Sequence, residues 1–82
     1  MNVIRPKSEI LTFCTVDDGR KLIINSVIDK ISRDLITFTA DDEDESIWVE
    51  IECGESLVQI PYELLKKAIA LVPDAVHSET WY

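Results

Sequence analysis

The densest group of chemically competent side chains is a run of five consecutive carboxylates in a chain of 82 residues, Asp41-Asp42-Glu43-Asp44-Glu45. Carboxylates can coordinate a hard cation, pair with Lys or Arg of a partner, or imitate the phosphates of a nucleic-acid backbone. A dedicated calcium loop places its ligands at alternate positions around a glycine, and this run has neither feature. We therefore expect no metal and no other cofactor, and we interpret the run as a contact surface.

Three side chains that follow the acidic run extend this surface. Trp48, Glu50 and Glu52 alternate with apolar residues, which predicts that they share the outward face of one strand. Tryptophan is among the residues most enriched at binding hot spots. Alternatively, Trp48 has a structural role, if a helix or the C-terminal aromatics fold over it. The candidate partner-binding residues are Asp41, Asp42, Glu43, Asp44, Glu45, Trp48, Glu50 and Glu52.

Catalytic chemistry has little support in this sequence. His77 is the only histidine, and it lies in a polar C-terminal stretch, 74–82, that we expect to be flexible. A nucleophile needs a base within hydrogen-bond reach, and the strand pattern around Cys14 predicts that this thiol is buried. The chain has no P-loop or dinucleotide-binding motif and only two glycines. We therefore expect a protein without enzymatic activity.

The charge balance points to a basic partner. The chain has 16 Asp and Glu against 8 Lys and Arg, a formal net charge of −8. Such a charge repels nucleic acid and anionic membranes and attracts basic proteins, and the cations form no stripe that could bind nucleic acid directly. No secretory signal and no membrane-spanning apolar run is present. We expect a cytoplasmic protein.

The two cysteines, Cys14 and Cys53, lie 39 positions apart in apolar strand patterns and form no CxxC motif. In a reducing compartment such thiols usually behave as small buried apolar residues. We expect both to be free and buried, with a disulfide between neighbouring strands as the alternative.

The clearest element around the candidate site is a hairpin over Ile47 to Ile60. Apolar residues alternate along its first half, and Gly54-Glu55 supplies the glycine-first pair of a type II′ turn. If Cys53 pairs with Ser56, this register places nearly all the apolar side chains on one face and Glu50 and Glu52 on the other. The agreement between turn and pattern favours this register.

A strand over Leu35 to Ala40 and a helix after Pro61 complete the surroundings of the hairpin. The acidic run would then be the loop between the two strands. Pro61 suits the first position of a helix and Pro73 its end, and apolar residues recur between them at helical spacing. We expect this helix to pack across the sheet.

The segment from Lys21 to Arg33 permits two interpretations. Asp18-Gly19 resembles a hairpin turn between strands, whereas the spacing of Ile24, Val27, Ile28, Ile31 and Leu35 fits a helix that Asp17 or Asp18 would cap. Several weak helix formers in the segment favour strands. A second helix remains the alternative.

These elements predict a single α+β domain, 1–82, made of a small curled antiparallel sheet, either a meander or a partly open barrel, with a C-terminal helix packed on it. We expect it to bind and inhibit or neutralise a basic protein such as a toxin, a nuclease or another nucleic-acid-binding protein. Immunity proteins, antitoxins and phage-encoded inhibitors act in this way, in some cases by nucleic-acid mimicry. The alternative is an interaction or assembly module, for example a homodimer, without inhibitory activity.

Overall fold

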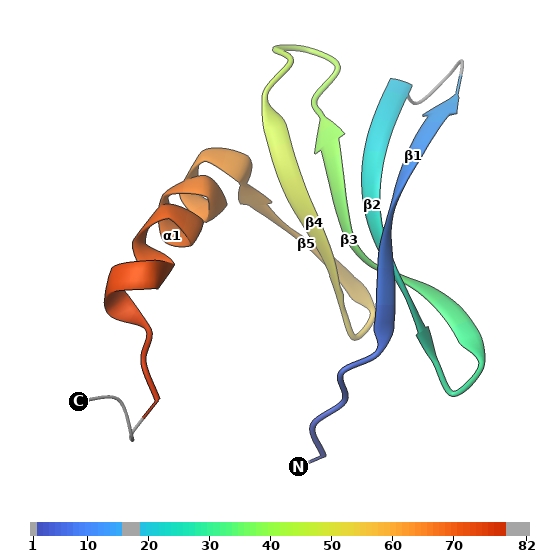
Figure 1. Cartoon of the computed structure of the whole chain (residues 1–82). Coiled ribbons are helices and arrows are strands. Elements are labelled where there is room, and N and C mark those ends of the chain that lie inside the picture. The colour runs from blue at the N-terminus through green and yellow to red at the C-terminus, as the bar shows by residue number, and fades with distance from the viewer. Residues whose placement is uncertain (1, 16–18, 79–82) are drawn as a thin grey trace.

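The computed structural model describes residues 2–15 and 19–78 as an open antiparallel sheet and one helix (Figure 1). Five strands pair in chain order, β1-β2-β3-β4-β5, without closing into a barrel. The predicted α+β class, with a C-terminal helix packed on a meander sheet, is confirmed. The elements are β1 Lys7–Thr15, β2 Gly19–Ile28, β3 Ile31–Ala40, β4 Ile47–Cys53, β5 Ser56–Pro61 and α1 Tyr62–Ala75.

The β4–β5 hairpin has the register that the sequence predicted. Gly54 has a φ of 63°, and the first central position of a type II′ turn requires a positive φ, which glycine adopts without steric cost. The turn and the apolar alternation therefore impose the same pairing. The pairs are Cys53 with Ser56, Glu52 with Leu57, Ile51 with Val58, Glu50 with Gln59 and Val49 with Ile60.

The segment Lys21 to Arg33 forms strands, so the helical alternative is wrong. β2 and β3 are joined by a tight turn at Asp29-Lys30, where both residues have positive φ, 53° and 66°. That combination is the signature of a type I′ hairpin turn, whose twist matches the strands beside it. The predicted turn at Asp18-Gly19 falls mostly on residues 16–18, outside the described residues, as do the proposed helix caps Asp17 and Asp18; Thr15 and Gly19 pair on either side.

The boundaries of α1 differ from the prediction at both ends. Pro61 is the N-cap, in extended conformation with ψ of 132°, and the helix continues through Pro73 to Ala75. Proline costs the helix one backbone hydrogen bond, but the N–H of Val76 donates to the carbonyl of Val72 at 3.0 Å and closes the last turn. The helix therefore extends into the segment expected to be a flexible tail.

Strand alternation and register give the sheet two distinct faces. The face that we call the apolar face carries two cross-strand rows of mostly aliphatic side chains. On β3, β4 and β5 the opposite face, which we call the acidic face, carries Thr37, Trp48, Glu50, Glu52 and Leu57. The rows of the apolar face are Ile10, Ile24, Ile36, Ile51 and Val58, and Thr12, Leu22, Phe38, Val49 and Ile60.

The core is small and lies where α1 begins on the apolar face. Val49 is 1% exposed, and the rings of Phe38 and Tyr62 meet edge to face with centroids 6.2 Å apart. Ile60 and Leu65, both half-buried, occupy the positions that form a hydrophobic staple at a helix start. The helix contacts β4 and β5, and its N-terminal end thus anchors it to the sheet.

Both cysteines are free and exposed, which corrects the prediction that they are buried. Cys14 and Cys53 lie at the ends of β1 and β4, beyond the region that α1 covers, so the apolar alternation there did not imply burial. Because β1 and β4 are not neighbours in the sheet, the predicted alternative of a disulfide between neighbouring strands is also wrong. The C-terminal aromatics, Trp81 and Tyr82, lie outside the described residues.

A candidate acidic binding surface

The acidic run forms the loop between β3 and β4, at the tip of the sheet (Figure 1). The N–H of Asp41 donates to the carbonyl of Ser46 at 2.8 Å, and the N–H of Glu45 donates to the carbonyl of Asp41 at 2.9 Å. Glu45 adopts a positive φ of 60°, a conformation that costs a non-glycine residue free energy. These bonds fix the loop backbone, although all five carboxylate residues are exposed.

Two of the five carboxylates also bond the loop itself. Asp41 Oδ1 accepts the N–H of Glu43 at 2.8 Å, and Asp44 Oδ1 accepts both the N–H and the Oγ–H of Ser46, at 3.0 and 2.6 Å. The hydrogen bond from the Ser46 side chain, followed by that from its backbone, lowers the pKa of Asp44 below its usual value. The loop therefore holds two of its five carboxylates in a defined geometry.

Ser46 connects the loop to Trp48. The indole N–H of Trp48 donates to Ser46 Oγ at 2.9 Å, and the side chain is half-buried in register with Thr39 and Pro61. The helix begins on the other side of the sheet, where Tyr62 contacts Phe38. Trp48 thus remains partly accessible on the acidic face, with its polar edge tied to the acidic loop.

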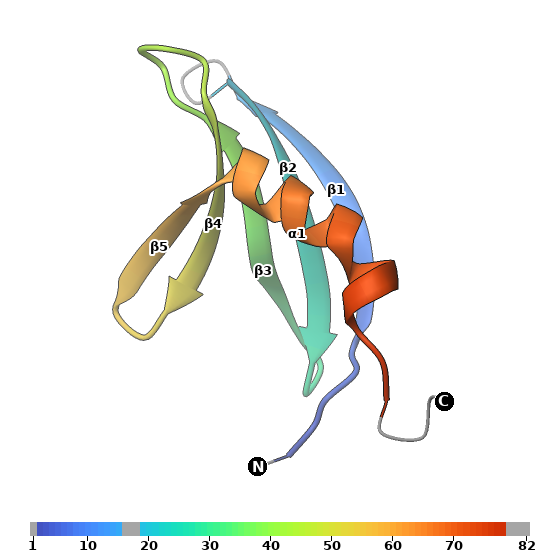
Figure 2. The same cartoon turned by 90° about the vertical axis from the view of Figure 1, so that its left-hand side faces the viewer.

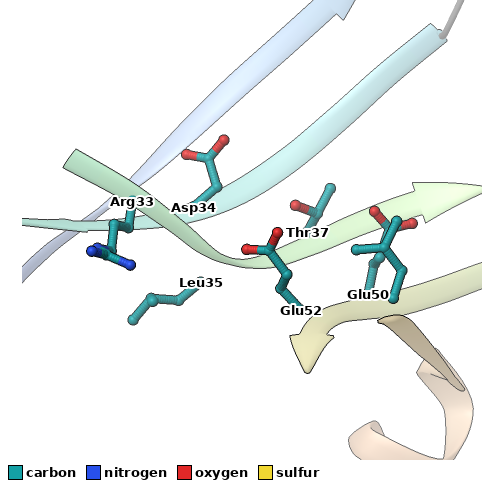
Figure 3. Close-up of a pocket in the computed structure, with 7 residues that line it drawn as sticks. Arg33, Asp34, Leu35, Thr37, Glu50 and Glu52 are labelled. Atoms are coloured by element: carbon teal, nitrogen blue, oxygen red, sulfur yellow. The ribbon is translucent and has the colours of Figure 1, made fainter. Parts of the chain in front are cut away.

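Glu50 and Glu52 line an open groove further along the same face (Figure 3). Glu50 is half-buried and accepts a hydrogen bond from Gln59 Nε2 at 2.9 Å, whereas Glu52 is exposed. The lining includes one cation, Arg33, and three carboxylates. The lining residues are Arg33, Asp34, Leu35, Thr37, Glu50, Glu52 and Leu57.

The β3 side of this groove was not predicted, because it depends on an irregularity in the β2–β3 pairing. Ile24 pairs with Ile36 and Asn25 with Asp34, so Leu35 has no partner across the sheet. Such a bulge bends the strand and redirects its side chains. Asn25, only 7% exposed, then donates to Asp34 Oδ1 at 2.8 Å and fixes its carboxylate. A polar Asn in an apolar strand was the only sequence signal for this arrangement.

The structure thus places the predicted site residues in two groups on β4 and its preceding loop. Residues 41–45 lie at the tip, Glu50 and Glu52 lie in the groove, and Trp48 stands between them. Within residues 2–15 and 19–78, no three His, Cys, Asp or Glu side chains come together in a way that could hold a metal ion. The arrangement offers separate carboxylates along one surface, a geometry suited to several contacts with a cationic macromolecule.

Comparison with known proteins gives no relative from which a function could be transferred. No family model, no curated protein and no solved structure matches this chain. Among the described residues, no helix has the length and apolar character needed to cross a membrane.

Proposed function

We propose that this chain is a non-enzymatic protein that binds and inhibits or neutralises a basic protein, such as a toxin, a nuclease or another nucleic-acid-binding protein. The observation that carries the proposal is the acidic loop: residues 41–45 are all exposed, yet backbone and side-chain hydrogen bonds fix the loop. An immunity protein, antitoxin or phage-encoded inhibitor needs such a fixed anionic surface and no reaction centre.

The order of the loop favours affinity as well as attraction. A flexible acidic tail would lose conformational entropy on binding, whereas a loop already fixed by its own bonds loses less. Its charge increases the rate of encounter with a basic partner. Trp48 is half-buried beside the carboxylates. It adds an apolar contact to the electrostatic attraction, and tryptophan is enriched among the residues that contribute most to binding.

A spaced series of carboxylates also suits a partner that normally binds phosphates. The acidic loop directly precedes β4, and Glu50 and Glu52 lie further along that strand. A protein whose basic surface follows a nucleic-acid backbone could pair with several of these groups at once. This chain would then compete with nucleic acid for that surface.

An assembly module without inhibitory activity is the second candidate function. The observation that favours it is the large exposed apolar area on the other face of the sheet and on α1, since surfaces of this kind commonly mark interaction sites.

Affinity capture from the lysate of the source organism tests the proposal. The bait is the full chain, compared with a variant in which the loop acids are neutralised (Asp41→Asn, Asp42→Asn, Glu43→Gln, Asp44→Asn, Glu45→Gln). Five charge pairs at roughly 0.5 kcal/mol each sum to roughly 2.5 kcal/mol, so affinity for the captured basic protein should fall about 70-fold. It should also fall with added salt.

A second variant controls for net charge alone. Glu9→Gln, Asp29→Asn, Glu55→Gln, Glu63→Gln and Asp74→Asn remove the same number of charges outside the acidic loop. We expect this variant to retain the partner nearly as well as the wild type. Equal capture by all three baits, or capture without inhibition of the partner's activity, would contradict the proposed function.

A further inference from the structure

Most of α1 and five of the ten residues in the two rows of the apolar face are exposed. α1 has no buried residue, and the stripe that starts at Tyr62 and Leu65 continues into Ile69 and Val72, which are 61% and 46% exposed. On the sheet, Ile10 is 68% exposed. Soluble monomers rarely leave contiguous apolar areas of this extent in water.

The two surfaces lie opposite each other. In Figure 1, α1 descends beside the sheet and diverges from it, and in Figure 2 the helix stands in front of β1, β2 and β3. Its main contacts, however, are with β4 and β5. An apolar hollow on the sheet, lined in part by Leu22, Phe38, Ala40 and Ile47, also lies open. The helix therefore covers only the part of the apolar face next to its first turn.

The total exposed surface of the chain is larger than that of a compact monomer of the same mass. The chain exposes 7495 Å², whereas a compact monomer of its mass exposes about 5,000 Å². Its radius of gyration is 15.4 Å, against about 12 Å for a compact chain of this length. Residues 2–6 and 76–78, which lie outside the sheet and the helix, account for part of the excess. Even half of it, taken from two chains, amounts to about 2,500 Å², which lies within the range of an obligate homodimer interface.

We propose that a second copy of this chain covers these surfaces, with the α1 stripe of each protomer packed on the apolar face of the other. A twofold axis makes this contact self-complementary, since each chain supplies one helix and receives one. The stripe consists of Leu65, Ile69 and Val72, and the receiving rows are aliphatic or aromatic apart from Thr12, so both sides lose apolar surface together. This interaction is separate from the acidic surface of the proposed function.

Charge favours a second copy over a basic partner at this interface. The two rows of the apolar face contain no carboxylate, so a cationic protein would find nothing there to pair with. Two chains of charge −8 repel each other least where their charged groups point away. The acidic loop and the groove with Glu50 and Glu52 belong to the tip and to the opposite face, and remain accessible in the dimer.

Sedimentation equilibrium of the full chain tests the proposal. At micromolar concentration the wild type should have twice the chain mass of 9.4 kDa. Ile69→Asp places a carboxylate in the contact and should weaken dimerisation at least about 100-fold, because a buried unpaired charge is costly. Leu57→Asp, at a residue of similar exposure on the acidic face, adds the same charge and should leave the mass unchanged.

Each alternative result overturns the proposal. A monomeric wild type excludes the dimer, and a dimer that survives Ile69→Asp places the contact elsewhere, for example along the free edge of β1. Circular dichroism of both variants shows whether either one is unfolded. If the wild type is dimeric and only Ile69→Asp loses its fold, that result supports burial of Ile69 in the dimer. The variant with neutralised loop acids should remain dimeric, so failure of this inference and failure of the proposed function are distinguishable.

Nuclear Overhauser effects between chains give a second measurement that does not depend on a variant. In a sample that mixes isotope-labelled and unlabelled chains, methyl contacts between chains should join Ile69 and Val72 to the rows of the apolar face. Contacts between chains that involve only β1 would overturn the proposed arrangement.

Discussion

The acidic loop and the helix α1 are both exposed, but the carboxylates of the loop interact favourably with water and the aliphatic side chains of the helix do not. In the loop, Asp41 and Asp44 accept hydrogen bonds from the backbone beside them, and all five carboxylate residues are exposed to solvent. On α1, Ile69 and Val72 have no comparable compensation, since water is a poor environment for an aliphatic side chain. The loop is therefore stable as an exposed surface, whereas the helix stripe is a surface that favours association.

The acidic loop and the apolar surfaces should therefore bind partners through different physical forces. Contacts of the loop depend on charge, so they should weaken with salt. Contacts of the apolar face and α1 depend on the removal of apolar area from water and should be nearly indifferent to salt or stronger in sulfate. The two surfaces are both exposed, so they differ in the chemistry of their exposed side chains and not in exposure itself.

The largest effect in the remaining predictions concerns the small core under the apolar face. Val49→Ala removes two methyl groups from the side chain that is 1% exposed and should lower the free energy of unfolding by about 2 kcal/mol. The matched change Val27→Ala, at a side chain that is 48% exposed and points to the other face, should change it by less than about 0.5 kcal/mol. Urea denaturation at one fixed protomer concentration measures both. Equal losses would show that the apolar face has no distinct core.

A smaller effect is expected from the strained position in the acidic loop. Glu45→Gly relieves the positive φ of 60° and should raise the free energy of unfolding by roughly 0.5–1 kcal/mol, because the left-handed conformation costs a side chain more than glycine loses in entropy. Glu45→Gln removes the charge, keeps the strain and should leave stability nearly unchanged. If both variants respond alike in urea denaturation, charge and not backbone conformation determines the effect.

The smallest effect is a titration within the loop. Ser46→Ala removes the side-chain hydrogen bond to Asp44 and should return part of the lowered pKa toward its usual value. Because the folded-state pKa lies below the unfolded value, the carboxylate stabilises the fold at neutral pH, and this contribution is lost as pH falls through the folded-state pKa. Carbon-detected NMR titration of the Asp44 carboxyl group measures the change. An unchanged pKa of Asp44 in this variant would mean that the hydrogen bond from the Ser46 side chain does not lower it.

Sequence reasoning succeeded where the determining interactions are local. Gly54 and the alternation on both sides of it specify one hairpin register, and that register is observed. It failed where burial depends on which layer covers a strand: Cys14 and Cys53 have apolar strand neighbours yet lie exposed at strand ends. The same holds for the candidate site: its residues on β4 and in the preceding loop were predicted from the sequence, and its β3 side was not. Asp34 lines the groove because of a bulge at Leu35. No glycine or other turn residue near Leu35 predicts this bulge.

The sequence by itself determined the acidic character of the chain, the hairpin, the placement of Glu50 and Glu52 on one face of β4 and the presence of a helix after Pro61, because turn chemistry, side-chain period and charge act over a few residues. Only the tertiary structure decided where that helix goes. It anchors at Tyr62 and leaves Ile69, Val72 and half of the apolar face exposed. Apolar attraction has no direction, so a pattern specifies which side chains should be buried and not which surface buries them.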